Sequence, residues 1–232
     1  MSFCVYQVLL YSFFSITGIR QTIATIATIY GIKLIKERKL IQFVLIILLA
    51  GLVHKSVLIF LPFYIIARIP LGKFAILGSI IGLPIIFPFA RTIALFLATV
   101  SASDQYMMYA ESDFATSGAQ NFLIFILLSG VIVLYAKFKD NKAIPDYVSN
   151  AIAIAIFFTP MMWVDPTLMR VIQYFSIFVL VGLPPSFKVI KTYLKTDVVY
   201  WLFLLVLIAT IIRHNYEYGF LWDTMRLGEN YF

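Results

Sequence analysis

Long apolar runs alternate with short polar segments along most of this chain. Runs such as 122–128 and 201–208 are apolar on every side and lack the alternation with period two that marks barrel strands. The hydrocarbon core of a bilayer holds no water, so a backbone inside it must satisfy its hydrogen bonds within helices or a closed barrel. The pattern therefore predicts membrane-spanning helices. The apolar segments fall at about 2–17, 20–35, 40–67, 73–90, 121–137, 147–163, 167–187 and 198–213.

The composition agrees with a membrane protein. Hydrophobic residues make up 62% of the 232 residues and charged residues only 12%, whereas a soluble domain carries roughly 25% charged residues. We therefore expect an all-α fold, a polytopic transmembrane helix bundle of about 7–9 membrane segments in a single domain over residues 1–232. The first segment lacks a basic region and a cleavage site of small residues, so we expect a retained span rather than a signal peptide.

The basic residues gather in the connections between apolar segments. In a soluble protein a net charge of +7 would suggest nucleic acid, but this distribution is how membrane topology is specified, and no nucleic-acid partner is expected. The positive-inside rule places three basic clusters in the cytoplasm. They are Lys33, Lys36, Arg38 and Lys39; Lys137, Lys139 and Lys142; and Lys188, Lys191 and Lys195.

Segment 40–67 leaves two topologies open. Either it is a bent hairpin with its tip at His54, or it crosses once and the Gly/Pro-rich segment 73–90 dips in without crossing. We favour the hairpin because it keeps His54 and the lysine after it out of hydrocarbon. It also makes residues 91–120 a long outer loop and 214–232 an outer tail, whose tyrosine, phenylalanine and tryptophan residues are typical of interfacial anchors.

Ionisable residues in or beside spans are costly and by default mark function. Arg20 opens the second span, where a fixed guanidinium can grip phosphate with two hydrogen bonds; the alternative is an arginine that snorkels to the headgroups. His54 and Lys55 lie in the longest apolar segment, where an imidazole can act as a general base and an ammonium can hold an anion. A hydrogen-bonded structural histidine beside a snorkelling lysine is the competing interpretation.

Arg170 shares one helical face with Thr167, Gln173 and Tyr174, because offsets of three and four residues stack along a helix. A polar stripe in a transmembrane helix faces protein or a watery cavity rather than lipid. This stripe is the strongest indication of a site that the residues themselves provide. Asp165 lies in the turn before it, so a simple ion pair with Arg170 is the structural alternative.

The predicted outer loop, 91–120, carries residue types that suit sugar recognition. The rings of Tyr106 and Tyr109 can stack on sugar faces, while Asp104 can accept hydrogen bonds from sugar hydroxyls. A solvated loop with interfacial tyrosines explains the same residues equally well. No metal-ligand constellation, Walker loop or dinucleotide fingerprint occurs in the sequence, so neither a metal nor another cofactor is expected.

Several short motifs, in the same order, resemble the EpsG-like family of Wzy-type bacterial polysaccharide polymerases. They are Ile19-Arg20-Gln21 with Ala24, the basic turn at 36–39, the stretch at 50–56 with Leu61-Pro62, and Arg170-Val-Ile-Gln-Tyr174-Phe175 near Pro184. Members of that family usually have further membrane segments before the span that holds Arg20. This chain is therefore expected to be the C-terminal part of a family member.

The resemblance implies a GT-C-like fold in the bacterial inner membrane, with an active face outside the cytoplasm. The implied reaction joins repeat units carried on undecaprenyl diphosphate, for exopolysaccharide, capsule or O-antigen. Arg20 and Arg170 would hold the departing diphosphate, and His54 or Asp104 would act as the base. A chain-length regulator, a flippase and membrane lipids are the implied partners. Further substrate-binding candidates are Lys55, Arg91, Asp104, Tyr106, Tyr109, Asp165, Gln173 and Tyr174.

Two other functions remain open. A membrane O-acyltransferase could also use a histidine, but it would need a path for an acyl donor from the cytoplasm. A flippase or other transporter of lipid-linked glycans is the non-enzymatic alternative. Transporters often contain two related halves, and no such internal repeat is visible in this sequence.

Overall fold

In the computed structural model of the chain, residues 2–6, 19–71, scattered positions between 74 and 92, 117–164 and 169–213 are described. These residues are helical, with no strand among them, and the predicted all-α class is confirmed. The helices are α1 (Ser2–Val5), α2 (Ile19–Lys36), α3 (Leu40–Val53), the 3₁₀ helix η3 (Lys55–Phe60), α4 (Phe63–Ile66), α7 (Ser117–Lys139), α8 (Asp146–Val164), α9 (Met169–Ser176), α10 (Val179–Leu194) and α11 (Val198–Arg213).

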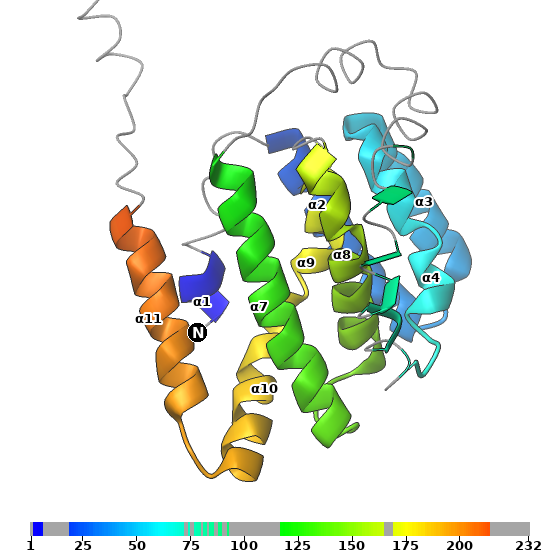
Figure 1. The fold of residues 1–232 in the computed structure, drawn as a ribbon. Helices are drawn as coiled ribbons and strands as arrows, with labels where there is room; N and C mark the ends of the chain where they lie inside the picture. The colour runs from blue at the N-terminus through cyan, green and yellow to red at the C-terminus, as the bar shows by residue number, and fades with distance from the viewer. Residues whose placement is uncertain are drawn as a thin grey trace, which may run out of the picture.

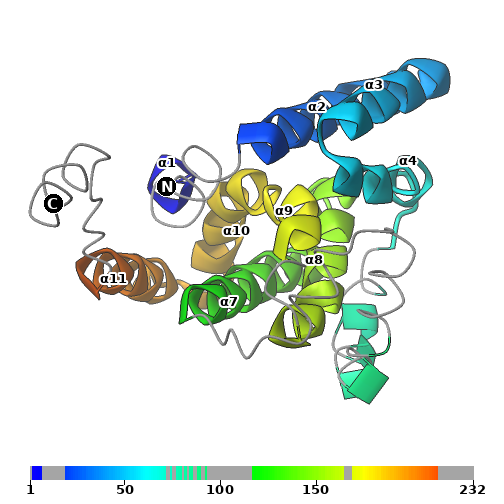
Figure 2. The ribbon, with the colours of Figure 1, turned by 90° about the horizontal axis from the view of Figure 1, so that it is seen from above.

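The longer helices form a bundle of roughly antiparallel neighbours (Figure 1). Seen from above, the α2–α3 pair lies on one side, α7 to α10 form the centre, and α11 lies on the other side (Figure 2). The close approach of α2 and α3 depends on Gly31, because a Cβ there would lie 3.0 Å from the ring of Phe43. On the same helix, the hydroxyls of Thr25 and Thr28 are buried and bond to carbonyls of their own helix. This removes their need for water and leaves a surface that packs closely.

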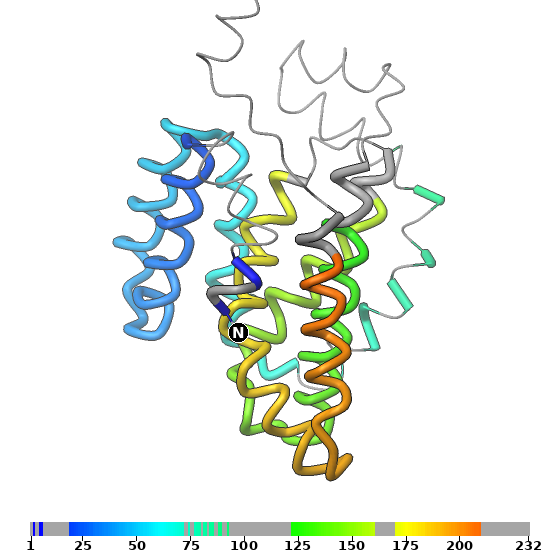
Figure 3. The backbone as a smooth tube through the Cα atoms, turned by 90° about the vertical axis from the view of Figure 1, so that its left-hand side faces the viewer, coloured from blue at the N-terminus to red at the C-terminus, as the bar shows by residue number. Residues whose placement is uncertain are grey.

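The three predicted basic clusters lie toward one end of the bundle, where α2, α7 and α10 end, and we call it the basic end (Figure 3). Lys36 Nζ on α2 donates to Tyr147 Oη on α8 at 3.1 Å. Tyr193 Oη on α10 donates to the carbonyl of Lys139 on α7 at 3.0 Å. The opposite end, called the site end, holds the start of α2, the end of α3 and the start of α9.

Segment 40–67 follows the path of a hairpin. α3 stops at His54, whose backbone is extended at φ −150° and ψ 105°, and the chain then returns through η3 and α4. Arg68 Nη2 donates to the carbonyl of Ile35 at 3.0 Å, so the segment ends beside the turn from which it started. The return is tight, since a Cβ on Gly51 would lie 2.8 Å from Leu58 Cδ2. The favoured hairpin is confirmed as a chain path.

A cluster of phenylalanine rings fixes the returning arm of this hairpin against the rest of the bundle. Phe60 of η3 packs on Phe63 at 4.8 Å and on Phe175 of α9 at 5.4 Å between ring centroids. All three are almost completely buried. Buried aromatic side chains contribute much of the packing energy of a core. The cluster therefore sets where the start of η3 lies relative to α9.

The membrane spans are only partly visible in the described residues. One stretch, Phe122–Lys139 of α7, is long and apolar enough to cross a bilayer by itself. The predicted single segment 167–187 is two helices, α9 and α10, bent by 45° at the break between them, and this pair would be a second span if it crosses as one. The polytopic bundle of about 7–9 segments stays a prediction. The apolar helices Leu40–Val53, Lys55–Ile66 and Val198–Ala209 are shorter.

Candidate functional site

Three basic side chains from distant parts of the sequence come together at the site end. Arg20 lies in the first turn of α2, His54 between α3 and η3, and Arg170 in the first turn of α9. The charges of both arginines act on the His54 imidazole. Arg20 is exposed, while His54 and Arg170 are half-buried. The three catalytic candidates predicted from the sequence therefore belong to one cluster.

Neither arginine has an ion-pair partner in the part of the chain that the structure describes. Two guanidinium groups beside a neutral imidazole give the cluster a net positive charge. Guanidinium groups bind phosphate through paired charge-assisted hydrogen bonds. The cluster is therefore suited to an anionic group such as a diphosphate.

His54 lies in the connection between two helices rather than inside an apolar helix. Burial first, then the charge of Arg170 and then that of Arg20, lowers the pKa of this imidazole below its usual value. The neutral form therefore predominates near neutral pH. Its Nε2 atom is buried and has no hydrogen-bond partner within the described ranges. A neutral imidazole with a free nitrogen can accept a proton from a substrate hydroxyl.

A buried amide pair joins the two helices that carry the arginines. Gln21 Nε2 donates to the carbonyl of Arg170 at 3.0 Å and also to Gln173 Oε1. Because a carbonyl can only accept, the first bond fixes which end of the Gln21 amide faces α9. The orientation of Gln173 follows, and its own Nε2 is buried without a hydrogen-bond partner among the described residues. We call these two side chains the glutamine pair.

A second contact links the hairpin to α9. Ser56 lies two residues after His54, and its Oγ forms a hydrogen bond of 2.9 Å with Tyr174 Oη. Tyr174 is fully buried. Together with the phenylalanine cluster, this bond fixes the connection that holds His54 against α9.

The structure places the other predicted site residues unevenly. Lys55 is exposed beside His54. Gln173 and Tyr174 are fully buried and bond to protein groups, as expected for a polar stripe that faces protein, while their contact with substrate stays a prediction. The remaining candidates lie outside the described residues: Arg91, Asp104, Tyr106, Tyr109 and Asp165.

Two residues of this site were missed by the sequence reasoning, Gln21 and Ser56. A signal for Gln21 was present, because Gln21, Thr25 and Thr28 follow one another at offsets of four and three on one face of α2. All three are buried. Across the described residues, no group of three or more histidine, cysteine or acidic side chains could hold a metal ion.

The fold and the site together define an all-helical bundle that holds a cationic cluster around a half-buried histidine. A model of the EpsG family matches residues 1–225. The chain therefore belongs to the EpsG family. No curated protein and no solved structure matches it. Membership of the family implies a polysaccharide polymerase-like role in a membrane-associated protein.

Proposed function

We propose that the chain is a membrane glycosyltransferase that joins repeat units carried on undecaprenyl diphosphate during polysaccharide synthesis. Arg20 and Arg170 bind the diphosphate of the donor, and His54 is the general base. The observation that carries this proposal is the convergence of these three side chains from three separate elements. Family membership supports the same chemistry.

The reaction needs one bond to form and one to break. The hydroxyl oxygen of the acceptor sugar attacks the anomeric carbon of the donor, while the bond from that carbon to the diphosphate breaks. The proton of the hydroxyl passes to the free Nε2 of His54. Negative charge grows on the leaving diphosphate, where the two guanidinium groups stabilise it more strongly than in the ground state.

The surface of the hairpin suits a lipid environment. Ile41 and Leu52 on α3 are 76% and 85% exposed, and exposed apolar faces of this kind mark contact with lipid or with another protein. Lipid around α3 would bring the lipid carrier of the donor beside the cationic cluster. The positive-inside rule assigns the basic end to the cytoplasm. His54 lies at the opposite end. This arrangement favours a polymerase over an O-acyltransferase with a cytoplasmic donor.

The experiment uses the full chain, reconstituted with a synthetic oligosaccharide linked to a polyprenyl diphosphate. Lysine is a point charge without the planar fork of arginine, so Arg20→Lys and Arg170→Lys should each lower polymer formation by about tenfold or more. Polymer is measured as a ladder on a gel, and folding is measured by thermal unfolding in detergent. Lys142→Arg exchanges the same two residue types at an exposed position of the basic end; it is the matched control and should keep parental activity. Near-parental polymer from both site variants would rule out the diphosphate role.

A further inference from the structure

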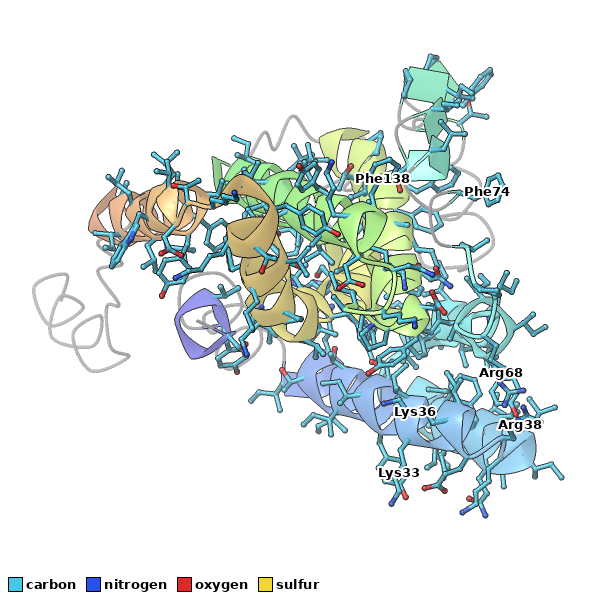
Figure 4. The ribbon with its side chains drawn as sticks, turned by 90° about the horizontal axis from the view of Figure 1, so that it is seen from below. Lys33, Lys36, Arg38, Arg68, Phe74 and Phe138 are labelled. Carbon is cyan, nitrogen blue, oxygen red and sulfur yellow. The ribbon has the colours of Figure 1, made fainter. Side chains whose placement is uncertain are left out.

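A second cationic site lies at the basic end, where the hairpin returns to α2. Two hydrogen-bond donors meet at the carbonyl oxygen of Ile35. The backbone N–H of Arg38 donates to it at 3.2 Å, and the side-chain Nη2 of Arg68 donates to it at 3.0 Å. Arg68 also donates to Tyr64 Oη at 2.6 Å and lies over that ring. Figure 4 shows the two arginines side by side at this end of the bundle. We call them the arginine pair.

Among the described residues of this turn, the acidic side chain is Glu37, and it is paired with lysines. Glu37 pairs with Lys39 at 2.7 Å and with Lys33 at 4.0 Å. The hydrogen bond from Lys39 is the main reason why the pKa of Glu37 lies below its usual value. Neither member of the arginine pair has an ion-pair partner among the described residues. Two arginines that meet at one turn without a carboxylate of their own bring positive charge together, and an anion bound there would offset it.

The backbone at Arg38 is a further sign that its side chain is needed. Its φ is 59°, and it is one of two residues other than glycine at positive φ in the described chain. The other is Lys195, which follows α10 at the same end. Glycine is the usual residue in this left-handed position after a helix. A basic residue is present instead in both turns, although the backbone there favours glycine.

Exposed apolar residues flank the arginine pair in the sequence. Leu40 and Ile41 follow the turn, and Ile65 and Ile69 flank Arg68 in sequence; each is exposed. A free anion in water gains nothing from such neighbours, whereas a lipid has hydrocarbon directly beside its phosphate. Phospholipid headgroups bind basic sites at the ends of membrane helices through this combination of charge and apolar contact.

We infer that the arginine pair binds the phosphate of an anionic phospholipid headgroup at the basic end. The bound phosphate bridges the free N–H groups of Arg38 and Arg68, and the acyl chains lie against the exposed residues of α3 and α4. The site is distinct from the cationic cluster around His54 at the opposite end. Its occupancy would hold the turn between α2 and α3 against the end of α4.

The test titrates the purified full chain in neutral detergent at low ionic strength with short-chain phosphatidylglycerol, short-chain phosphatidylcholine or inorganic phosphate. Binding is followed by native mass spectrometry and by the shift in the unfolding temperature. Phosphatidylglycerol should bind and stabilise the parent, while the other two ligands should not. Arg38→Gly should weaken phosphatidylglycerol binding by about tenfold, the loss expected for one charge-assisted contact.

Arg38→Gly suits this test because glycine fits the left-handed backbone, so the variant without lipid should unfold at the parental temperature or above it. Lys142→Gln is the matched control, an exposed basic residue at the same end and outside the arginine pair, and it should bind lipid like the parent. Equal lipid binding by Arg38→Gly would overturn the inference. An equal loss in Lys142→Gln would also overturn it, because surface charge alone would then explain binding. Stabilisation by inorganic phosphate as strong as by phosphatidylglycerol would overturn the choice of a lipid.

Discussion

The imidazole of His54 differs from that of a surface histidine in what surrounds it. It is half-buried, it feels two guanidinium charges, and its Nε2 has no hydrogen-bond partner within the described ranges. Each of these features favours the neutral, proton-accepting form. The same features make its titration a direct probe of the proposed mechanism.

Substitution of His54 by glutamine should slow polymer formation by about 10²–10⁴-fold, because glutamine keeps a hydrogen-bonding side chain but cannot take up the proton. In the parent, protonation at low pH removes the base, so the rate should fall as pH decreases. Because the pKa of His54 is lowered, the midpoint should lie below the usual value of about 6.5. Initial rates across pH, together with donor binding, measure both effects. A glutamine variant as fast as the parent would move the base role to a loop carboxylate such as Asp104.

Lys137 illustrates a buried charge with a structural purpose. Its Nζ donates to the carbonyls of Asn141 and Ile144, each at 2.6 Å, and pairs with Asp146 at 2.8 Å. The side chain is 2% exposed. These contacts close the turn between α7 and α8. Lys137 therefore stabilises the structure of this turn and is not a candidate catalytic residue.

Lys137→Met should lower the free energy of unfolding by about 2–3 kcal/mol, because the two carbonyls lose their donor and Asp146 loses its ion-pair partner. The loss should be moderate for a buried pair, since Asp146 is 37% exposed and can be solvated. Denaturant unfolding in detergent measures the change. Lys139→Met, on the same helix but exposed, should change stability by less than about 0.5 kcal/mol. Equal effects of the two substitutions would contradict the stabilising role of Lys137 in this turn.

At the scale of elements, the glutamine pair connects α2 to α9 and thereby sets the distance between Arg20 and Arg170. Gln21→Leu should destabilise the fold by about 1–3 kcal/mol, because it leaves the buried amide of Gln173 without its partner. Adding Gln173→Leu should restore much of that stability, since two apolar groups replace both partners. If the pair positions the arginines, polymerisation should stay low in the double variant.

Thermal unfolding and rates of polymer formation on the same samples separate these two effects of the glutamine pair. A double variant that recovers both stability and rate would show that the pair only packs the helices. A double variant that recovers stability alone would show that the pair positions the arginines for the reaction.

Gly182 lies where α10 packs on both α7 and α8. A Cβ added there would lie 3.0 Å from Cγ1 of both Val133 and Val148, and β-branched side chains have little freedom to move away. Gly182→Ala should therefore lower the unfolding temperature, because overpacking costs about 1–3 kcal/mol and exceeds the gain in helix propensity. Gly78→Ala is the matched control, because no atom of the described residues lies within 4 Å of the new Cβ, and it should be neutral or slightly stabilising. A Gly182→Ala variant as stable as the parent would mean that the three helices shift apart.

Much of the helical layout could be predicted from the sequence. The expected segments 20–35 and 198–213 agree closely with α2 and α11, because basic residues and polar turns mark their limits. The bend between α9 and α10 was not predicted, since apolar residues continue through Ile177 and Phe178 without a break in pattern. The hydropathy of a segment depends on the surroundings of its side chains, so it gives almost no information on where a helix bends.

The candidate site was only partly predictable for a different reason. Periodicity placed Arg170, Gln173 and Tyr174 on one face because they belong to one helix. Nothing local indicates that Gln21 meets that face, since this contact joins residues 149 positions apart. Such contacts are set by the packing of whole helices. The residue types were therefore predictable, while their mutual arrangement required the fold.

At the scale of the whole molecule, the two cationic sites lie at opposite ends of the bundle. His54 and its arginines are at the site end, and the arginine pair is at the basic end. The proposed function requires the site end to face outward, where lipid-linked glycans are joined. The proposed lipid site faces the other way. One measurement of orientation therefore bears on both proposals.

Cysteine labelling tests this orientation, with Lys55→Cys at the site end and Asn141→Cys at the basic end, each after Cys4→Ser. Both positions are exposed in the structure. A membrane-impermeant thiol reagent should modify Lys55→Cys in intact spheroplasts, because the positive-inside rule places the basic end in the cytoplasm. Asn141→Cys should react only after the membrane is permeabilised. The reverse pattern would place His54 in the cytoplasm, where the O-acyltransferase alternative would become the better explanation of the histidine.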